Sequence, residues 1–420
     1  MRWFIVVLFI LMIGCKKEDE RPPVISVTSP FSMTQFEIPF QVTISGTVED
    51  ENTIEWIKII ILDDDLRPSS EEVLINTSSN LVEFSELIYL DDIHLSSGVY
   101  YIKVSANDGQ NINSSYVEIN IQEFPLLLKN IFVVASDNTQ TTLYEIDSNS
   151  LDFVHQFPGQ FQLASSVSKH QYLFIGTNQI GNAFDPDFNQ NIWNWTFNTF
   201  QSNYFIDSQV GESGDVLHVC CIDGVLRSFT DNGIITNTVY SSNQDYFDDF
   251  LVVDNYLFVE EYSSSTDRYI TVYFLESGVE MQRISTSNDI VDILEYSSNQ
   301  CLFLEQNFSD IRINMYDLNS NISWELKTIN NDSIYDAEYV INRGLFFSSN
   351  TGFMLYDLAT NSSTTLIANS GFKKIIFDKK NENFYLLADN EIWIYSISSG
   401  QYQTVSTNYN LEEILLFYNK

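Results

Sequence analysis

Short hydrophobic runs separated by turn-forming residues make up almost the whole chain. From residue 22 onward, β-branched and aromatic residues alternate with polar ones or cluster at strand length, as in Phe40–Thr47 and Val99–Ala106. Turn formers such as Asn107-Asp108-Gly109 separate these runs. A period of two indicates β-strands, and no segment has the period of about 3.6 residues that marks an amphipathic helix. We therefore expect an all-β protein.

Residues 22–123 form the first of two predicted domains. Their pattern predicts roughly six or seven short strands, the density typical of a β-sandwich. Ser97–Gly109 resembles the penultimate strand and turn of bacterial immunoglobulin-like and fibronectin-like modules. The resemblance implies an immunoglobulin-like β-sandwich. Asp63–Asp65 and Asp91-Asp92 fall in its turns, where we expect solvated carboxylates rather than a calcium loop because the ligand spacing is missing.

After a short junction at Gln122–Pro125, an internal repeat covers residues 126–420. Aromatic residues recur in one strand of each repeat at intervals of 40, 45, 44, 43, 40 and 39 residues: Tyr144, Phe184, Phe229, Tyr273, Tyr316, Tyr356 and Tyr395. Another apolar run precedes most of them. Four short strands per repeat, seven times, are typical of a β-propeller. The sequence therefore predicts a seven-bladed propeller.

The register of the repeat also predicts how the ring closes. Ile131–Val134 corresponds to the second strand of a blade, whereas Leu411–Tyr418 corresponds to an innermost strand. Closing a ring removes the open sheet edges at its two ends. We expect the C-terminal strand to complete the first blade.

Two segments resemble known propeller families. Asn182–Asp187, followed by Ile192–Trp195, resembles a blade of the quinoprotein type, and Leu355–Asn361 is similar to the turn of surface-layer and lactonase-like propellers. The resemblance implies a fold and carries almost no information about chemistry. The Gly and Trp signature positions of the quinoprotein repeat are missing from most blades. We therefore expect no quinone, and no other cofactor.

The N-terminus resembles that of a bacterial lipoprotein. Met1-Arg2 is a short basic start, and the eleven apolar residues Trp3–Ile13 are too few to span a bilayer core, which needs about 20. Gly14-Cys15 then resembles a lipobox, with Met12 where Leu is usual. The resemblance implies a signal peptide over residues 1–14, lipidation of Cys15 and a charged tether over residues 15–21.

The tether carries a run of charged residues, Lys16–Glu20. A solvated spacer is one interpretation. The other is a resemblance to the signal of lysine and acidic residues that sends lipoproteins of some Gram-negative bacteria to the cell surface. We expect a protein anchored by lipid in the outer membrane and facing the cell surface; the periplasmic side is the alternative.

The charge balance limits the partners. The 420 residues contain 20 Lys and Arg against 57 Asp and Glu, a formal net charge of −37. Nucleic acid is therefore excluded, because phosphate binding depends on Lys and Arg. Cationic partners remain compatible with this charge. The chain is nevertheless expected to fold, because aromatic residues make up 14% of it and supply ample apolar surface to bury. We expect a monomer that contacts the membrane through its anchor and recognises a protein or a glycan.

Alignment of the repeats brings out one candidate site. The predicted innermost strand begins with an acidic residue in four blades. These residues are Asp248, Asp292, Asp336 and Glu412, and a fifth blade has Lys373 at the same place. Innermost strands surround the axis, so these groups are expected near one mouth of the central channel, where they would bind a cation or a basic segment. The alternative is that strand ends beside solvent are simply polar.

Enzyme motifs do not appear in the sequence. There is no G-x-S-x-G, H-E-x-x-H or P-loop motif, and the four histidines are scattered. His155 and His218 fall in strands, where we expect structural roles. The sequence predicts no catalytic residue and favours a binding or scaffold protein. The alternative is a propeller enzyme, a lyase or lactonase-like hydrolase, with a metal such as calcium at the channel mouth.

Overall fold

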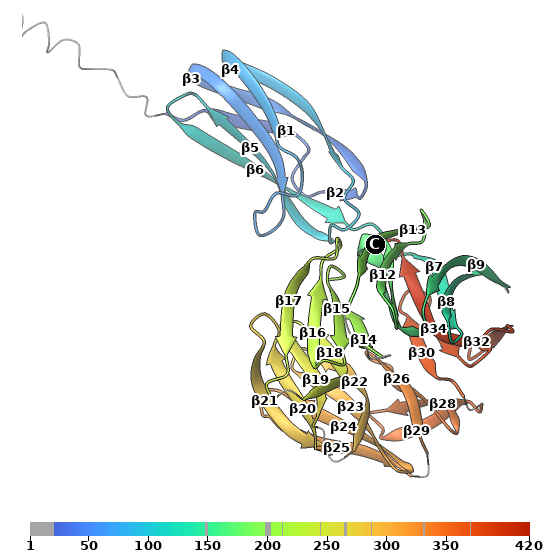
Figure 1. Ribbon diagram of the computed structural model, residues 1–420. Helices are drawn as coiled ribbons and strands as arrows, with labels where there is room; N and C mark the ends of the chain where they lie inside the picture. The colour runs from blue at the N-terminus through green and yellow to red at the C-terminus, as the bar shows by residue number, and fades with distance from the viewer. Residues whose placement is uncertain are drawn as a thin grey trace, which may run out of the picture. The chain divides into compact units, whose positions relative to one another are not determined.

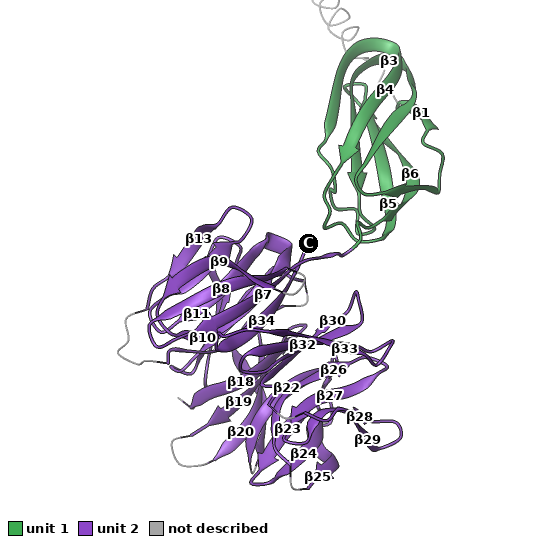
Figure 2. Ribbon diagram, turned by 90° about the vertical axis from the view of Figure 1, so that its right-hand side faces the viewer, with its two compact units in different colours: residues 1–125 green, residues 126–420 purple. Residues whose placement is uncertain are grey.

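The computed structural model describes residues 21–147, 150–197, 203–211, 213–243, 245–263, 267–286, 288–330, 332–369 and 371–420. Cys15 and the tether up to residue 20, for which lipidation and export are expected, lie outside the described residues. The chain divides into two compact units, residues 1–125 and 126–420 (Figure 2). We describe each unit by itself.

Unit 1 contains six strands around one core. They are β1 (Val24–Ser29), β2 (Thr34–Glu37), β3 (Phe40–Leu62), β4 (Val73–Leu90), β5 (Gly98–Asn107) and β6 (Ile112–Gln122). Hydrogen bonding gives the order β1-β3-β5-β6-β2, with β4 also paired to β3. Strand β2 runs parallel to β6. The alternation that predicts strands in the sequence corresponds to alternating burial along β3.

The long strand β3 has two halves with different neighbours. Its first half pairs with β1 through residues 45–49, and its second half pairs with β5 through residues 56–62. Strand β4 continues along both halves. Ile44 from the first half and Ile57 and Ile59 from the second are fully buried in the same hydrophobic cluster. The two halves therefore enclose a common core.

Within the described residues, unit 2 contains seven four-stranded antiparallel sheets. The sheet containing the C-terminus comprises β34 (Leu411–Tyr418), β7 (Leu128–Ser136), β8 (Gln140–Asp147) and β9 (Ser150–Pro158). The next comprises β10 (Phe161–Val167), β11 (Tyr172–Thr177), β12 (Gly181–Asp185) and β13 (Gln190–Trp195), with a 3₁₀ turn η1 (Ser168–His170) after β10. The third comprises β14 (Phe205–Val210), β15 (Leu217–Cys221), β16 (Val225–Phe229) and β17 (Ile235–Tyr240).

The other four sheets repeat this order. The fourth comprises β18 (Tyr246–Val253), β19 (Tyr256–Tyr262), β20 (Arg268–Phe274) and β21 (Val279–Thr286). The fifth comprises β22 (Asp289–Ser297), β23 (Gln300–Asn307), β24 (Asp310–Asp317) and β25 (Ile322–Ile329). The sixth comprises β26 (Ile334–Val340), β27 (Gly344–Ser349), β28 (Gly352–Asp357) and β29 (Ser362–Ile367). The seventh comprises β30 (Lys374–Asp378), β31 (Asn383–Leu387), β32 (Glu391–Ser396) and β33 (Tyr402–Ser406).

The seven sheets contact one another in a closed cycle. The first strands of successive sheets touch in the order β34, β10, β14, β18, β22, β26, β30 and back to β34. The C-terminal strand β34 pairs antiparallel with β7, the first strand of unit 2 (Figure 1). Hydrophobic clusters join the β34 sheet to the neighbouring sheets on both sides. Unit 2 is a β-propeller, closed by pairing of the two ends of its chain.

Burial follows the position of a strand within its sheet. The second strands β11, β15 and β27 are buried at every residue, whereas the fourth strand β29 is mostly exposed. The second strands are therefore packed on both faces, which explains their continuous apolar sequences. The seven repeated aromatic residues each lie in the third strand of a sheet and are buried.

Candidate functional site

The chain enters the innermost strand with the same pattern in six of the seven sheets: a buried apolar residue, a variable residue and a charged residue. The six segments are Phe205-Ile206-Asp207, Phe247-Asp248-Asp249, Ile290-Val291-Asp292, Ile334-Tyr335-Asp336, Phe372-Lys373-Lys374 and Leu411-Glu412-Glu413. In five of them a β-bulge follows the apolar residue. A bulge inserts an extra residue and re-aims the side chain after it. We call the six charged residues at the third position the axial ring.

Axial-ring residues on sheets that are not neighbours affect each other's pKa. Burial raises the pKa of Asp207 to about 6, Lys374 acts against this increase, and Asp336 adds to it. The strands of Lys374 and Asp336 are each three sheets away from β14 around the cycle. Side chains on sheets that lie so far apart around the ring can come close to one another only across the central axis of the propeller. The axial ring therefore faces the centre of the propeller.

Two ring carboxylates also join one sheet to the next. Asp292 Oδ2 accepts a hydrogen bond of 3.1 Å from the backbone N–H of Ala337, in the next innermost strand. Asp336 Oδ2 accepts one of 2.6 Å from the N–H of Ile375, in the strand after that. Asp292 and Asp336 occupy equivalent positions in neighbouring sheets, so the same hydrogen bond between sheets occurs twice.

The carboxyl groups at the centre hold protons more tightly than free ones. Burial raises the pKa of Glu413 to about 7. It also raises the pKa of Glu338, two residues after Asp336 in β26, to about 7. The pKa values of Asp249 and Asp292 are raised well above their ordinary range, first by burial and then by neighbouring carboxylates. Crowded like charges and partial removal from water both favour the neutral acid.

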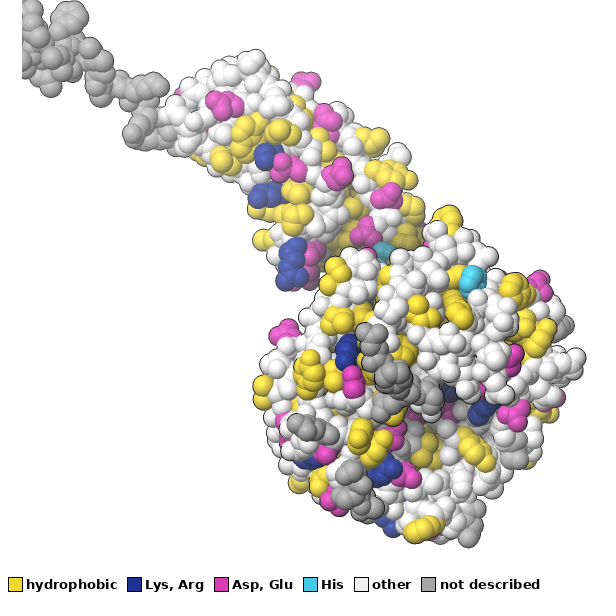
Figure 3. All heavy atoms as spheres, viewed as in Figure 1, with side chains coloured by type: hydrophobic (Ala, Val, Ile, Leu, Met, Phe, Trp, Pro, Cys, Tyr) yellow, Lys and Arg dark blue, Asp and Glu magenta, His cyan; other side chains and the backbone are white. Residues whose placement is uncertain are grey.

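Lys374 is the only cation at the six ring positions. Its Nζ lies 3.4 Å from Asp336 Oδ1, and carboxylates, first of all Asp336, raise its pKa well above the ordinary value. Asp249 Oδ2 is buried and has no hydrogen-bond partner within the described part of the chain. One ammonium group is therefore shared among several carboxylates, and part of their hydrogen-bonding capacity is unused. Figure 3 shows acidic and basic side chains meeting near the middle of unit 2.

The structure places the four predicted site residues in two groups. Asp292 and Asp336 belong to the axial ring, but Asp248 and Glu412 each precede a ring residue by one position. The Asp248 side chain is 49% exposed and lies 3.9 Å from Arg268. Glu412 lies 3.6 Å from Lys373. All four blades carry the bulge, but only these two have adjacent charged residues, Asp248-Asp249 and Glu412-Glu413, and in each pair the second residue occupies the ring position.

Sequence alignment of the repeats missed Asp207, Asp249, Lys374 and Glu413 as ring members, and it missed Glu338. A signal for the ring is present in the sequence, because the charged residue always lies two positions after a buried apolar residue. In three blades the ring residue is preceded directly by another charged residue. Either member of such a pair could then be taken as the charged residue at the start of the innermost strand. Glu338 has no equivalent in the other repeats and carries no such signal.

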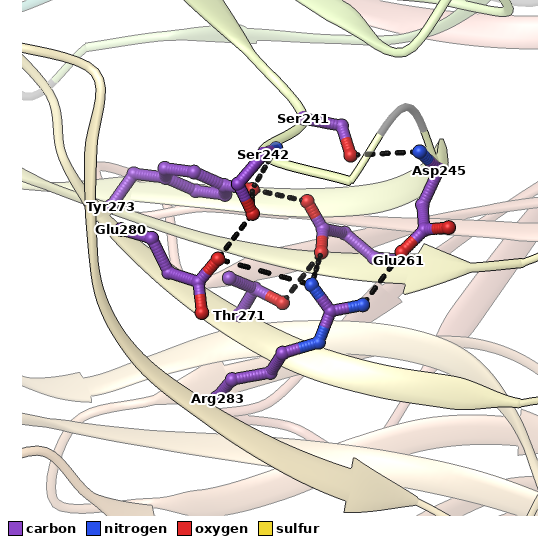
Figure 4. Close-up of polar contacts among 8 residues, drawn as sticks. All are labelled: Ser241, Ser242, Asp245, Glu261, Thr271, Tyr273, Glu280 and Arg283. Carbon is purple, nitrogen blue, oxygen red and sulfur yellow. Dashed lines mark hydrogen bonds and ion pairs between the residues drawn. The ribbon is translucent and has the colours of Figure 1, made fainter.

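A second group of charges lies in the fourth sheet (Figure 4). Glu261 in β19 is fully buried, and it accepts hydrogen bonds from Thr271 Oγ1 at 2.8 Å and from Tyr273 Oη. Arg283 Nη1 lies 2.8 Å from Glu261 Oε2, and Arg283 Nη2 lies 2.6 Å from Asp245 Oδ2. Asp245 belongs to the connection between β17 and β18. The buried Glu261 is thus matched by donors, which assigns this group a structural role in fixing the connection between two sheets.

The neighbouring residue Glu260 points to the opposite side of β19. It accepts a hydrogen bond of 2.6 Å from Arg268 and one of 3.2 Å from the backbone N–H of Ile290, in the next sheet. Burial raises its pKa to about 7 despite the arginine. Glu260 therefore ties the fourth sheet to the fifth, whereas Glu261, through Arg283, holds the connection that leads into β18.

Neither a metal site nor a membrane-spanning helix is found in the described part of the chain. Within it, no three His, Cys, Asp or Glu residues are grouped so that they could hold a metal ion. The same residues include no helix that is long and apolar enough to cross a membrane.

Comparisons with known proteins add one structural likeness. No protein-family model and no curated protein sequence matches the chain. Among solved structures, a chain of the "Crystal Structure of Mitotic Checkpoint Complex" is similar over 59% of this chain and 78% of its own length, with a TM-score of 0.47 and 14% identity. The assignment of unit 2 as a β-propeller follows from its sheet order and the closed cycle of contacts.

Proposed function

We propose that this chain is a lipid-anchored binding protein whose propeller captures a cationic segment of a partner protein at the axial ring. The observation that carries the proposal is the excess of carboxylates at the centre. Lys374 forms an ion pair with Asp336 and acts electrostatically on the carboxyl groups of Asp207, Asp249, Asp292 and Glu413. A lysine or arginine of a partner would supply the missing positive charge and hydrogen-bond donors.

The orientation of the ring supports access from one end of the propeller. Asp207 lies near the start of β14, and Glu413 lies near the start of β34. Strand β34 ends beside Leu128, where the chain enters unit 2. The ring is therefore at the end of the strands away from this entry. A segment of a partner could reach it without passing the connection to unit 1.

The remainder of the chain fits an anchor and a spacer. We propose that unit 1 is an immunoglobulin-like sandwich, supported by the two halves of β3 pairing with different strands around one core. The seven sheets in cyclic contact support a seven-bladed propeller. Lipidation of Cys15 would anchor the chain in the outer membrane, with the propeller at the cell surface.

Binding of a model cation tests the proposed function. The full chain without its signal peptide is titrated calorimetrically with an octalysine peptide at low salt. We expect binding that weakens with salt and strengthens from pH 5 to pH 8, as the ring carboxylates ionise. The variant D249N/D292N/E413Q should lose about tenfold or more in affinity, which corresponds to about 1.4 kcal/mol.

A charge-matched control separates the ring from general acidity. The variant D64N/D65N/D91N removes the same number of carboxyl groups from exposed turns of unit 1. It should bind octalysine as the unmodified chain does. If both triple variants weaken binding equally, or if the unmodified chain does not bind the peptide, the ring is not the binding site.

Protease treatment of intact cells tests the proposed location. Surface exposure predicts that added protease degrades the protein without permeabilisation of the outer membrane. Protection in intact cells, followed by degradation after permeabilisation, would place the protein on the periplasmic side instead.

A further inference from the structure

A polar groove of about 830 Å³ lies on unit 2, along the third and fourth sheets and the turn between β22 and β23. Its volume is within the range of small-molecule sites, about 300–1,000 Å³. The described residues that line it include no lysine or arginine, and most carry hydroxyl, amide or other polar groups. The lining thus favours a ligand that is polar but not anionic.

The base of the groove contains a buried histidine. His218 in β15 is 4% exposed. Its Nδ1 lies 2.9 Å from Ser228 Oγ in β16, which is also buried. Its Nε2 has no hydrogen-bond partner within the described chain. Burial lowers the pKa of His218 to about 4, so the imidazole is neutral at pH 7. The serine holds one ring nitrogen and leaves the other for a ligand.

Access to Nε2 depends on a glycine. Gly211 lies in the turn between β14 and β15 and also lines the groove. A Cβ atom at this position would lie 3.3 Å from His218 Nε2. Any larger residue would therefore crowd the free nitrogen, whereas glycine leaves it accessible from the groove.

The surrounding groups are suited to a hydroxyl-rich ligand. Asn255 and Asn299, at the tips of two hairpins, contribute amide groups that both donate and accept hydrogen bonds. Tyr256 adds an aromatic ring. The two acids of the lining, Asp254 and Glu276, are exposed. A buried cation would require converging carboxylates, and a purely apolar ligand would leave His218 Nε2 without a hydrogen-bond partner.

We propose that this groove binds a neutral saccharide, with His218 Nε2 hydrogen-bonded to a sugar hydroxyl and the hairpin asparagines contacting its rim. The site is separate from the axial ring. Gly211 follows the end of β14, whereas Asp207 lies near its beginning. The inference therefore does not depend on the cation-binding function proposed above, and the two sites can be tested one at a time.

The test titrates the full chain without its signal peptide with four neutral tetrasaccharides: maltotetraose, cellotetraose, mannotetraose and xylotetraose. Each is raised to about 10 mM, well above a millimolar Kd. We expect at least one to bind, with an affinity that does not change between pH 5.5 and 8. Its binding should also shift the ¹⁵N resonance of His218 Nε2.

Two variants and their controls locate the site. G211A should crowd Nε2, and N255A removes an exposed amide; each should weaken saccharide binding by about tenfold, while octalysine binding is unchanged. The controls are G98A, where an added Cβ has no neighbour within 4 Å, and N80A, at an exposed position in β4. Absence of binding by all four sugars, or binding that neither G211A nor N255A weakens, overturns the proposal.

Discussion

The carboxylate of Asp336 crosses the boundary between two sheets and accepts the backbone N–H of Ile375 at 2.6 Å. Its other oxygen lies 3.4 Å from Lys374 Nζ. The same side chain thus holds the sixth and seventh sheets together and takes part in the central charge cluster. A change of protonation at the ring should therefore affect the stability of the propeller as well as its binding.

Stability should fall as the pH rises from about 5 to 8. The pKa of Asp207 is raised to about 6, and those of Glu260, Glu338 and Glu413 are raised to about 7, each primarily by burial. Between their ordinary values and these values, the folded state binds more protons than the unfolded state, so a higher pH favours unfolding. We expect the melting temperature of unit 2, measured by calorimetry on the full chain, to be about 5 °C higher at pH 5 than at pH 8.

His218 acts in the opposite direction, because its pKa is lowered to about 4. One histidine opposes four carboxyl groups, so the melting temperature should still fall as the pH rises. The variant D249N/E413Q should flatten the slope. A melting temperature that rises from pH 5 to pH 8 would contradict the prediction.

Replacing Lys374 by methionine should destabilise the propeller mainly at high pH. The change removes the ammonium group but keeps most of the side-chain length. The Lys374 side chain is 42% exposed, so we expect a loss of only about 1–2 kcal/mol at pH 8. At pH 5 the loss should be smaller, because protonated carboxylates need no counter-charge. Urea unfolding at the two pH values measures the difference, and an equal loss at both would count against this account of the ring.

Closure of the ring should depend on the C-terminal strand. Phe417 in β34 is fully buried and packs edge-on against Phe132 in β7. Truncating it to alanine should cost about 3–5 kcal/mol. The control is F153A in β9, where the side chain is 64% exposed, so the loss should be within about 0.5 kcal/mol. Deletion of residues 411–420 should go further and produce an aggregating chain, which gel filtration would detect.

The buried group around Glu261 should behave as one unit. E261Q and R283M should each destabilise the protein, but the double variant should lose less than the sum of the two. We expect a coupling of about 1–3 kcal/mol from a double-mutant cycle in urea. T328A, which removes an exposed hydroxyl that donates to Glu325 at 2.7 Å, serves as a surface comparison. If the losses of unfolding free energy in E261Q and R283M simply add in the double variant, the two side chains do not stabilise each other, and the prediction is wrong.

Replacing Cys15 by serine should release the protein from the membrane. Without the thiol, no acyl chain can be attached by the route that the lipobox resemblance implies. We expect the variant to move from the membrane pellet to the soluble fraction and to lose incorporation of labelled palmitate. Labelling that persists in the variant would show that the anchor lies elsewhere.

The repeated turns show how much of the propeller can be predicted from sequence. Tyr316 Oη donates to Asn321 Oδ1 at 3.0 Å, and Tyr356 Oη donates to Asn361 Oδ1 at 3.2 Å. Both asparagines have positive φ angles, 51° and 52°, a conformation that asparagine tolerates well. The same local sequence therefore forms the same hairpin, and the amino-acid pattern by itself is enough to recognise such repeats.

Contacts between sheets are harder to predict. Glu261 pairs with Arg283, but the other repeats have no equivalent pair from which this contact could be predicted. Glu260 and Glu261 also interrupt a strand that is otherwise apolar. A rule of alternating faces would place one of the two in solvent, but β19 is a second strand and is packed on both sides. The axial ring was only partly predicted, because Asp248 and Glu412 stand directly before the ring residues Asp249 and Glu413 and carry the same charge.

The pairing of β34 with β7 also constrains how the protein is made. The ribosome synthesises β7 before the other strands of unit 2, and its partner β34 only after all of them. Until then the nascent chain can form separate hairpin sheets but not a closed ring, so the exposed edge of β7 must remain unpaired throughout elongation. Any factor that shields nascent chains would therefore be needed longest at this strand, and a premature stop codon anywhere before residue 411 would leave the edge open permanently.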